Sequence, residues 1–232
     1  MYVISTSNRM GDPMLFTPVA SWYYKTTGEK FHWLLTTRFE LYKKLEVLLR
    51  YQDFTSDITY FDYPMQHENP NFRSLTASDF GLSGDSINLC FALQTKSGKP
   101  LDDPPPVDRH ITDHWAIMFE WGVDKDFVLK YPKIECPSYE NVWIEAAPYK
   151  DTFKLIQKIV PRGSIELKES DSIELKINLS MNAKNVWTSG GGWAAMMDLC
   201  GRDVIIYQYK WEYPLADVRA YRRKHKYIFI DQ

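Results

Sequence analysis

Apolar and polar residues alternate along much of the chain with a period of two, the spacing expected of half-buried β-strands. The clearest case is the stretch in which Ile173, Leu175 and Ile177 point one way and Glu174 and Lys176 the other. Eight strands are predicted on this basis, at Val3–Thr6, Phe16–Lys25, Phe39–Gln52, Ser86–Leu93, Trp115–Trp121, Phe127–Ile134, Gly163–Lys168 and Ser172–Trp187.

A helical period is visible in only one short place. Phe31, Leu34 and Leu35 fall at i, i+3 and i+4, which predicts a short amphipathic helix. A helix is also the competing interpretation of Phe39–Gln52, because Leu, Glu and Lys are good helix formers. The alternation of apolar residues in that segment favours the strand.

Long irregular segments separate the predicted strands. Lys96–Arg109 contains five prolines and glycines and cannot be regular, and residues 53–84 and 135–160 are read as loops. Because no helices alternate with the strands, a parallel α/β sheet is not expected. The predicted fold is all-β, an eight-stranded antiparallel jelly-roll sandwich with one short helix and long loops. It would occupy residues 1–188, with a C-terminal surface extension at 189–232.

The strand interpretation also predicts which residues fill the hydrophobic core, because alternate side chains of a strand face opposite sides of the sheet. A shift of one residue in a strand would exchange its buried and exposed faces. The expected core residues are Leu45, Val47, Leu49, Leu89, Phe91, Ile117, Phe119, Val128, Ile173, Leu175, Ile177 and Leu179.

Composition adds a surplus of aromatic side chains. The 232 residues include 15 Tyr, 12 Phe and 8 Trp, which suits either an aromatic β core or a surface buried against other proteins. The net charge of −2 gives no overall attraction for nucleic acid or membrane. Cys90, Cys136 and Cys200 are odd in number and contain no CxxC, which argues against a disulfide framework or a structural zinc site.

No stretch approaches 18 apolar residues and no signal-peptide pattern opens the chain, so a soluble protein without a membrane span, made in the cytoplasm, is expected. The basic run Arg219–Lys226 fits a solvated tail or a partner contact, and less well a nucleic-acid contact.

Catalytic motifs were sought among the polar residues. His110 and His114 have HxxxH spacing, but they follow a proline run and not a helix, so a metal site is not predicted. Ser189–Gly192 is interpreted as a flexible hinge, because no strand-to-helix context or phosphate-loop Lys is evident. Without a nucleophile, base or metal cluster, the sequence predicts no enzymatic activity, no catalytic residue and no cofactor.

The order of the predicted elements, with the proline loop KSGKPLDDPPP and the run YPKIECPSYENVW, resembles picornavirus capsid proteins. The similarity is greatest to the largest surface shell protein, which surrounds the fivefold axes. The usual long N-terminal arm is absent from this sequence, and no Arg-Gly-Asp motif occurs.

The resemblance implies a structural protein of a non-enveloped icosahedral virion, assembled in the host cytoplasm. Its partners would be sister shell proteins, the viral RNA genome, a host receptor and a lipid-like molecule in the barrel. That pocket would be lined by Met118, Phe119, Trp121 and Met181, although the same side chains would also fill a solid core. Contacts to other proteins are expected at Tyr139, Trp143, Trp211 and Tyr213. Gln232 is expected to be the end produced by cleavage of a polyprotein.

Two other functions were weighed against the capsid interpretation. The first is a cellular β-sandwich module that binds carbohydrate on its aromatic residues. The second is a jelly-roll enzyme, which would need a ligand cluster that the sequence does not show.

Overall fold

Every strand pairing in the described part of the chain is parallel, and the strands form two five-stranded sheets. The computed structural model describes residues 1–5, 10–37, 40–62, 75–89, 111–112, 122–144, 158–168, 170–189, 192–209 and 225–230. The chain divides into two compact units, Met1–Phe127 and Val128–Gln232. The predicted division at 188/189 lies within strand β8 of the second unit.

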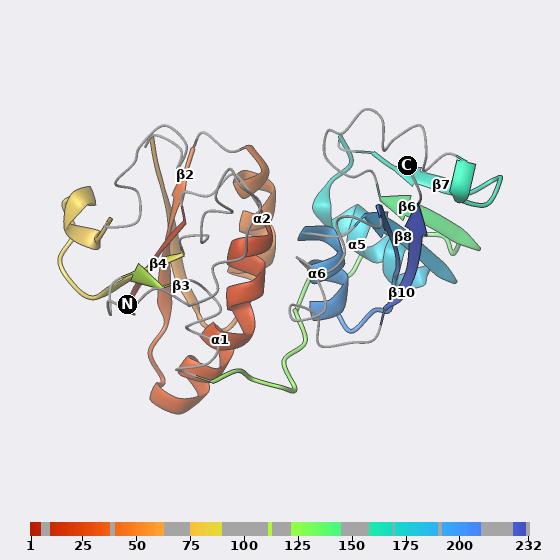
Figure 1. Ribbon diagram of the computed structural model, residues 1–232. Helices are drawn as coiled ribbons and strands as arrows, with labels where there is room; N and C mark the ends of the chain where they lie inside the picture. The colour runs from red at the N-terminus through yellow and green to blue at the C-terminus, as the bar shows by residue number, and fades with distance from the viewer. Residues whose placement is uncertain are drawn as a thin grey trace. The chain divides into compact units, whose positions relative to one another are not determined.

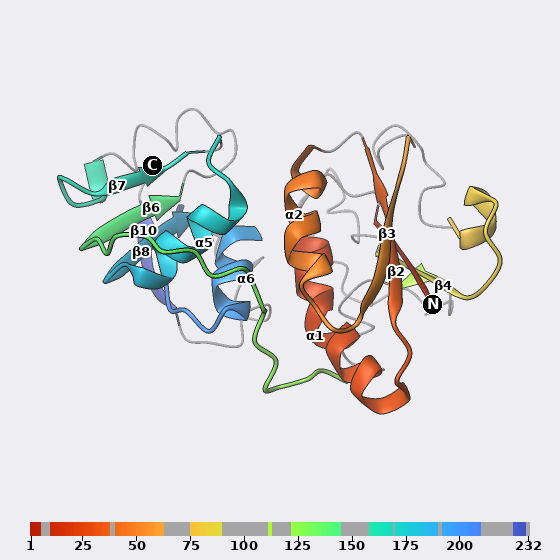
Figure 2. The ribbon, with the colours of Figure 1, turned by 180° about the vertical axis from the view of Figure 1, so that it is seen from behind.

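The first unit contains sheet A, with strand order β3-β2-β1-β4-β5. Helices α1 and α2 lie side by side along this sheet (Figures 1 and 2). The elements are β1 (Tyr2–Ser5), α1 (Gly11–Thr27), β2 (Phe31–Thr36), α2 (Glu40–Arg50), β3 (Thr55–Phe61), the 3-10 helix η2 (Ala77–Phe80), β4 (Ser86–Leu89) and β5 (Ile111–Thr112).

The second unit contains sheet B, with strand order β10-β9-β8-β6-β7. Helices α5 and α6 lie next to one another beside this sheet (Figures 1 and 2). The elements are β6 (Asn141–Ile144), β7 (Ile165–Leu167), α5 (Ile173–Asn182), β8 (Asn185–Ser189), α6 (Gly192–Leu199), β9 (Ile205–Tyr209) and β10 (Lys226–Ile230).

The expected antiparallel jelly roll is therefore wrong, because both sheets are parallel and the chain is α/β. Parallel strands are joined by crossovers and are covered on both faces, so they read as apolar runs without alternation. Strand β2 shows this: Phe31 and Trp33 pack against Phe16 of α1, while Leu34 packs with Ile4 on the other face. The helix predicted at Phe31–Leu35 is this strand.

Helix α1 replaces the strand predicted at Phe16–Lys25. Met14, Phe16, Val19 and Ala20 are all completely buried, so the helix has no polar stripe to reveal its period. Pro18 lies inside the helix and cannot donate to the Met14 carbonyl. The Thr17 hydroxyl donates to that carbonyl instead, at 2.6 Å. The proline is therefore tolerated, although it argues against a helix in the sequence.

The other long strand predictions also fail. Residues 40–50 form α2, the competing interpretation, with Leu45, Leu48 and Leu49 buried on one face. The segment from Ser172 is helix α5 followed by β8, and Ser172 caps the helix by accepting a hydrogen bond from the Leu175 amide at 3.2 Å. Residues 127–134 contain no regular strand.

The predicted core is partly confirmed. Six of its residues are buried: Leu45, Leu49, Leu89, Ile173, Ile177 and Leu179. Val47 and Leu175 are half-buried, because a helical face has replaced a strand face. The prediction that Val128 lies in the core is wrong, since its side chain is 56% exposed in the segment that joins the units. Phe91, Ile117 and Phe119 lie outside the described residues.

Candidate functional site

Each sheet has one place where the strand order reverses direction. In sheet A, the central strand β1 pairs with β2 on one side and with β4 on the other. In sheet B, β6 likewise lies between β7 and β8. In open parallel sheets, ligands bind outside the carboxyl ends of the strands at such switch points. Each unit therefore has a candidate site of its own, at the start of α1 in the first unit and at the start of α6 in the second.

In the first unit, the segment after β1 leads into α1. The last residue of β1, Ser5, is completely buried. Helix α1 begins at Gly11, so the backbone of Asp12 lies in its first turn. A helix that follows a parallel strand starts at the carboxyl edge of the sheet, and this places the first turn of α1 next to the switch point.

In the second unit, the segment after β8 leads into α6. Strand β8 ends at Ser189 and α6 begins at Gly192, so the Ser189–Gly192 run connects a strand to a helix. The expectation that this run lacks a strand-to-helix context is therefore wrong. The first N–H groups of a helix have no partner within it, and the helix dipole adds positive potential there. The first turn of α6 therefore suits an anion.

A cation from the neighbouring helix lies beside the start of α6. Lys176 of α5 is only 5% exposed, and its Nζ atom lies 5.1 Å from the centre of the Trp193 ring. Trp193 is the second residue of α6. The electron-rich ring face stabilises an ammonium group that burial removes from water. Positive charge is thereby held at the first turn of α6.

The other end of α6 is fixed by a buried polar pair. Asp198 and His225 are 2% and 8% exposed, and the Asp198 Oδ1 and His225 Nε2 atoms are 3.4 Å apart. The His225 Nδ1 atom accepts a hydrogen bond from the Val204 amide at 3.4 Å. Because His225 directly precedes β10, the pair connects α6 to the sheet and holds the helix in position.

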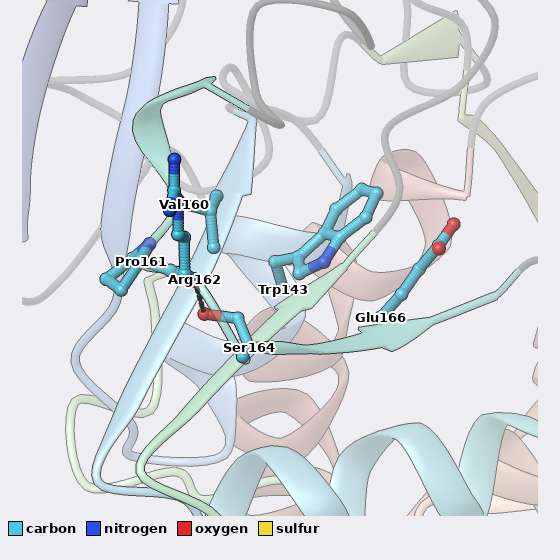
Figure 3. Close-up of a pocket in the computed structure, with 7 residues that line it drawn as sticks. Trp143, Val160, Pro161, Arg162, Ser164 and Glu166 are labelled. Atoms are coloured by element: carbon cyan, nitrogen blue, oxygen red, sulfur yellow. Dashed lines mark hydrogen bonds between the residues drawn. The ribbon is translucent and has the colours of Figure 1, made fainter.

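Two hollows in the second unit lie at the opposite, amino edge of the sheet. One, of about 250 Å³, is lined by Trp143, Val160, Arg162, Ser164 and Glu166 (Figure 3). Figure 3 shows the Trp143 ring between Arg162 and Glu166, and the Ser164 hydroxyl donating to the Pro161 carbonyl at 2.6 Å. The residues at 161–164 directly precede β7, so this hollow is separate from the carboxyl ends of the strands.

The second hollow, of about 480 Å³, is lined mainly by residues that precede β8, β9 and β10. Its basic side chains are Lys184, Arg202 and Lys226. Arg202 Nη2 donates to the carbonyls of Ala183 and Lys184, at 2.6 and 2.8 Å, and so caps the connection after α5. This structural role accounts for the arginine without a ligand.

Three of the residues proposed from the sequence for contacts or a pocket fall in the described part of the chain. Met181 is half-buried on α5 and Tyr139 is half-buried ahead of β6. Trp143 is 6% exposed and packs in a cluster with Val160, Trp187 and Tyr207. Met118, Phe119, Trp121, Trp211, Tyr213 and Gln232 lie outside the described residues.

Sequence reasoning missed Asp12, Lys176 and the strand–glycine–helix connection. The signal for the last was present, because the β-branched run before Ser189 and the Ala- and Met-rich run after Gly192 frame the glycines. Within the described ranges, no group of three or more His, Cys, Asp or Glu residues could hold a metal ion. In the same ranges, no helix is long and apolar enough to cross a membrane.

Comparison with known proteins finds similarity in structure only. No protein-family model matches the sequence, and no curated protein matches it. A glycosyltransferase family 9 structure from Veillonella parvula is similar with a TM-score of 0.60 and 10% identity, over 100% of this chain and 85% of that one. E. coli heptosyltransferase WaaC, solved with ADP, has a TM-score of 0.50 and 11% identity, over 90% of this chain and 87% of that one.

A third similar structure is the iron-containing dodecameric glycosyltransferase TibC from enterotoxigenic E. coli. It has a TM-score of 0.53 and 10% identity, over 89% of this chain. The chain spans 57% of the length of TibC.

These similarities overturn the expectations that rested on the resemblance to picornavirus shell proteins. The capsid function, the shell-protein, RNA, receptor and lipid partners, and the location in a virion are all wrong. So are the carbohydrate-binding module and the expectation that the protein is not an enzyme, because its structural neighbours are glycosyltransferases. The resemblance was based on a proline-rich loop and aromatic-rich runs, and such segments do not determine how the strands pair. The chain has the α/β fold with parallel sheets, known as GT-B, that these glycosyltransferases share.

Proposed function

We propose that the protein is a glycosyltransferase that moves a sugar from a nucleoside diphosphate sugar to a hydroxyl group of an acceptor. The observation that carries the proposal is the connection from β8 through three glycines into α6, at the switch point of sheet B. The fold similarity supports the same assignment. Among the similar structures, TibC was solved with ADP-D-β-D-heptose and WaaC with ADP.

The diphosphate of the donor is assigned to the start of α6. The free N–H groups of the first turn and the ammonium group of Lys176 would face its negative charge. This charge increases on the leaving group as the bond between the sugar and the diphosphate breaks. Groups fixed in advance around the developing charge lower the barrier, because they need no reorganisation during the reaction.

Asp12 is assigned as the base that accepts the proton of the acceptor hydroxyl. In the reaction, the acceptor oxygen bonds to the anomeric carbon, the carbon–oxygen bond to the diphosphate breaks, and the nucleoside diphosphate leaves with that electron pair. The acceptor hydroxyl must lose its proton to a base. Asp12 is the acidic residue whose backbone position in α1 is next to the switch point of sheet A. A carboxylate that acts as a general base contributes roughly 10²–10⁴-fold to the rate.

The first test is binding. Titration calorimetry with ADP, UDP and GDP, and with ADP-D-β-D-heptose, should detect at least one nucleotide with a dissociation constant below about 1 mM. The Gly192→Asp variant should lose this binding, because a carboxylate at the first residue of α6 repels the diphosphate. The Gly192→Ala variant is the uncharged control and should retain it. Absence of binding by all four nucleotides would contradict the proposed function.

The second test separates binding from chemistry. With any donor that binds, release of the nucleoside diphosphate is measured in the presence of an acceptor mixture. The Asp12→Asn variant should bind the donor normally and lose roughly 10²–10⁴-fold in rate. The exposed Asp126 offers a matched control, and Asp126→Asn should keep the rate. Unchanged turnover in Asp12→Asn would remove Asp12 from the mechanism.

A further inference from the structure

The hollow of about 480 Å³ lies entirely within the second unit, at the amino edge of sheet B. The first residues of three neighbouring strands line it, Asn185 of β8, Ile205 of β9 and Lys226 of β10. Its volume is in the range of about 300–1,000 Å³ that is usual for small-molecule sites. Because β8 spans five residues, this edge is roughly 15 Å from the carboxyl edge of the sheet. The hollow is therefore separate from the start of α6.

Positive side chains are in excess around this hollow. Among the described residues that line it, Lys184, Arg202 and Lys226 are basic and Asp203 is the one acidic residue. Lys184 is already paired with Glu140, with 2.9 Å between Nζ and Oε1. Arg202 and Lys226 are therefore the cations that can serve a ligand.

The smaller hollow of the same unit differs in this respect. Its lining includes one basic residue, Arg162, and one acidic residue, Glu166. These two charges cancel, so nothing in the lining favours an ion of either sign.

The structural role of Arg202 does not use its whole guanidinium group. The Nη2 atom caps the connection after α5, and the backbone amide donates to the Met197 carbonyl at 2.8 Å. These bonds fix the residue in position. Its Nε atom, in contrast, is buried and has no hydrogen-bond partner among the described residues. Buried donors without a partner are rare in folded proteins, so this N–H group calls for an acceptor.

Lys226 brings a second cation from a different element. It is the last residue of the basic run Arg219–Lys226 and the first of β10. Its backbone amide donates to the Val204 carbonyl at 3.1 Å, which fixes the residue beside the start of β9. Its side chain is exposed and forms no ion pair or hydrogen bond within the described part of the chain. The ammonium group is therefore available at a concave surface.

We propose that this hollow binds a small phosphate monoester, whose phosphate group accepts hydrogen bonds from Arg202 Nε and Lys226 Nζ. A phosphate group carries a charge of about −1.5 to −2 at pH 7 and three acceptor oxygens, so it can serve both cations at once. A phosphate group fills only part of such a hollow, which leaves room for an organic part beside Asn185 and Ile205. This site goes beyond the proposed function and does not depend on it.

NMR titration of ¹⁵N-labelled protein tests the site. The probes are glucose 6-phosphate and glycerol 3-phosphate, with inorganic phosphate and glucose for comparison. At least one ester should bind with a dissociation constant below about 1 mM and shift the amide signals of Arg202 and Lys226. Inorganic phosphate should bind at least about threefold more weakly, because it lacks the organic part, and glucose should not bind.

Three variants connect the binding to this hollow. Lys226→Met should weaken binding of the ester at least about tenfold, because a charge-assisted hydrogen bond is lost. Lys168→Met is the matched control and should bind normally, since this exposed lysine follows β7 at the opposite end of the sheet. Gly192→Asp should also bind the ester normally, because Gly192 lies at the carboxyl edge.

Several results would overturn the proposal. They are the absence of saturable binding by both esters, equal weakening in the two lysine variants, and inorganic phosphate binding as tightly as the esters. Loss of ester binding in Gly192→Asp would also overturn it, since the ester would then occupy the start of α6. None of these measurements involves a nucleotide, so the phosphate site can fail while the proposed function stands.

Discussion

The ammonium group of Lys176 on α5 lies over the Trp193 ring of α6, with its nitrogen 5.1 Å from the ring centre. The two residues join the helix that precedes β8 to the helix that follows it. Since Lys176 is 5% exposed, its ammonium group is largely removed from water, and contact with the Trp193 ring offsets part of that cost.

This pair gives the first prediction. A double-mutant cycle with Lys176→Met and Trp193→Leu should yield a coupling free energy of about 0.5–2 kcal/mol, the range for partly desolvated cation–π pairs. Urea unfolding of the four proteins measures it. Additive losses of stability would show that the two side chains do not interact.

The same lysine gives a second prediction for ligand binding. Lys176→Met should weaken binding of the nucleoside diphosphate about tenfold or more, because a charge-assisted contact with the diphosphate is lost. Lys184→Met provides the control, since Lys184 is exposed at the amino edge of sheet B and pairs with Glu140. Equal weakening in both variants would point to a general charge effect instead.

The third prediction concerns the effect of low pH on the hydrogen bonds of Asp124. Burial alone would raise the pKa of Asp124, but hydrogen bonds from Lys25 and Ser21 dominate and lower it. A carboxyl group with a lowered folded-state pKa contributes stability at pH values above its unfolded value of about 4, and the contribution disappears as the pH falls through the folded value. The amides of residues 124–127 should therefore lose protection below about pH 4, where protection is the exchange rate compared with the intrinsic rate at the same pH.

The matched variant for this test is Asp124→Asn, which removes the ionisable group at an unchanged size. Its amides at these residues should already have low protection at pH 7, and that protection should change little on acidification. An equal loss of protection in acid in the variant and the parent would assign the effect to other carboxyl groups.

The fourth prediction compares two positions on α5 whose sequence pattern is the same. Ile177 is completely buried, whereas Leu175 is half-buried. Ile177→Ala should cost roughly 2–5 kcal/mol of unfolding free energy, and Leu175→Ala clearly less. Denaturant unfolding distinguishes them, and a larger loss at Leu175 would restore the strand interpretation of this segment.

The fifth prediction concerns the buried thiol of Cys200. Burial raises the pKa of this thiol to about 12. Because the thiolate is the reactive form, Cys200 should react with a disulfide reagent only after unfolding. Mass spectrometry of partially labelled protein should find Cys136, which is half-buried, modified before Cys200.

Some of the fold could be predicted from the sequence because local pattern and environment agree there. Strands β4 and β7 lie within predicted strands, and Leu45, Leu49 and Ile177 were correctly placed in the core. The turn-forming residues also marked real boundaries, as at Gly28, which ends α1 with a φ of 76°.

The rest could not be predicted because burial hides periodicity. Helix α1 buries most of its circumference and contains a proline, and strand β2 is buried on both faces. In each, apolar residues occupy runs of neighbouring positions, so a helix and a strand look alike. With α1 assigned to a strand and β2 to a helix, the alternation of strands and helices disappeared, and with it the context of Ser189–Gly192.

The pairing of β1 has a consequence for the way the chain folds during synthesis. Tyr2 pairs with His32 on one side and with Ser86 on the other. The strand of sheet A that is synthesised first is thus the middle strand of that sheet. One of its edges can be covered by β2 early, but the other keeps its backbone N–H and C=O groups unpaired until β4 has been made. Pairing between strands so far apart in sequence is slow, and an open edge can pair with another chain. The nascent first unit therefore passes through a period in which it is prone to aggregate, which ends only when the residues after Asp85 emerge.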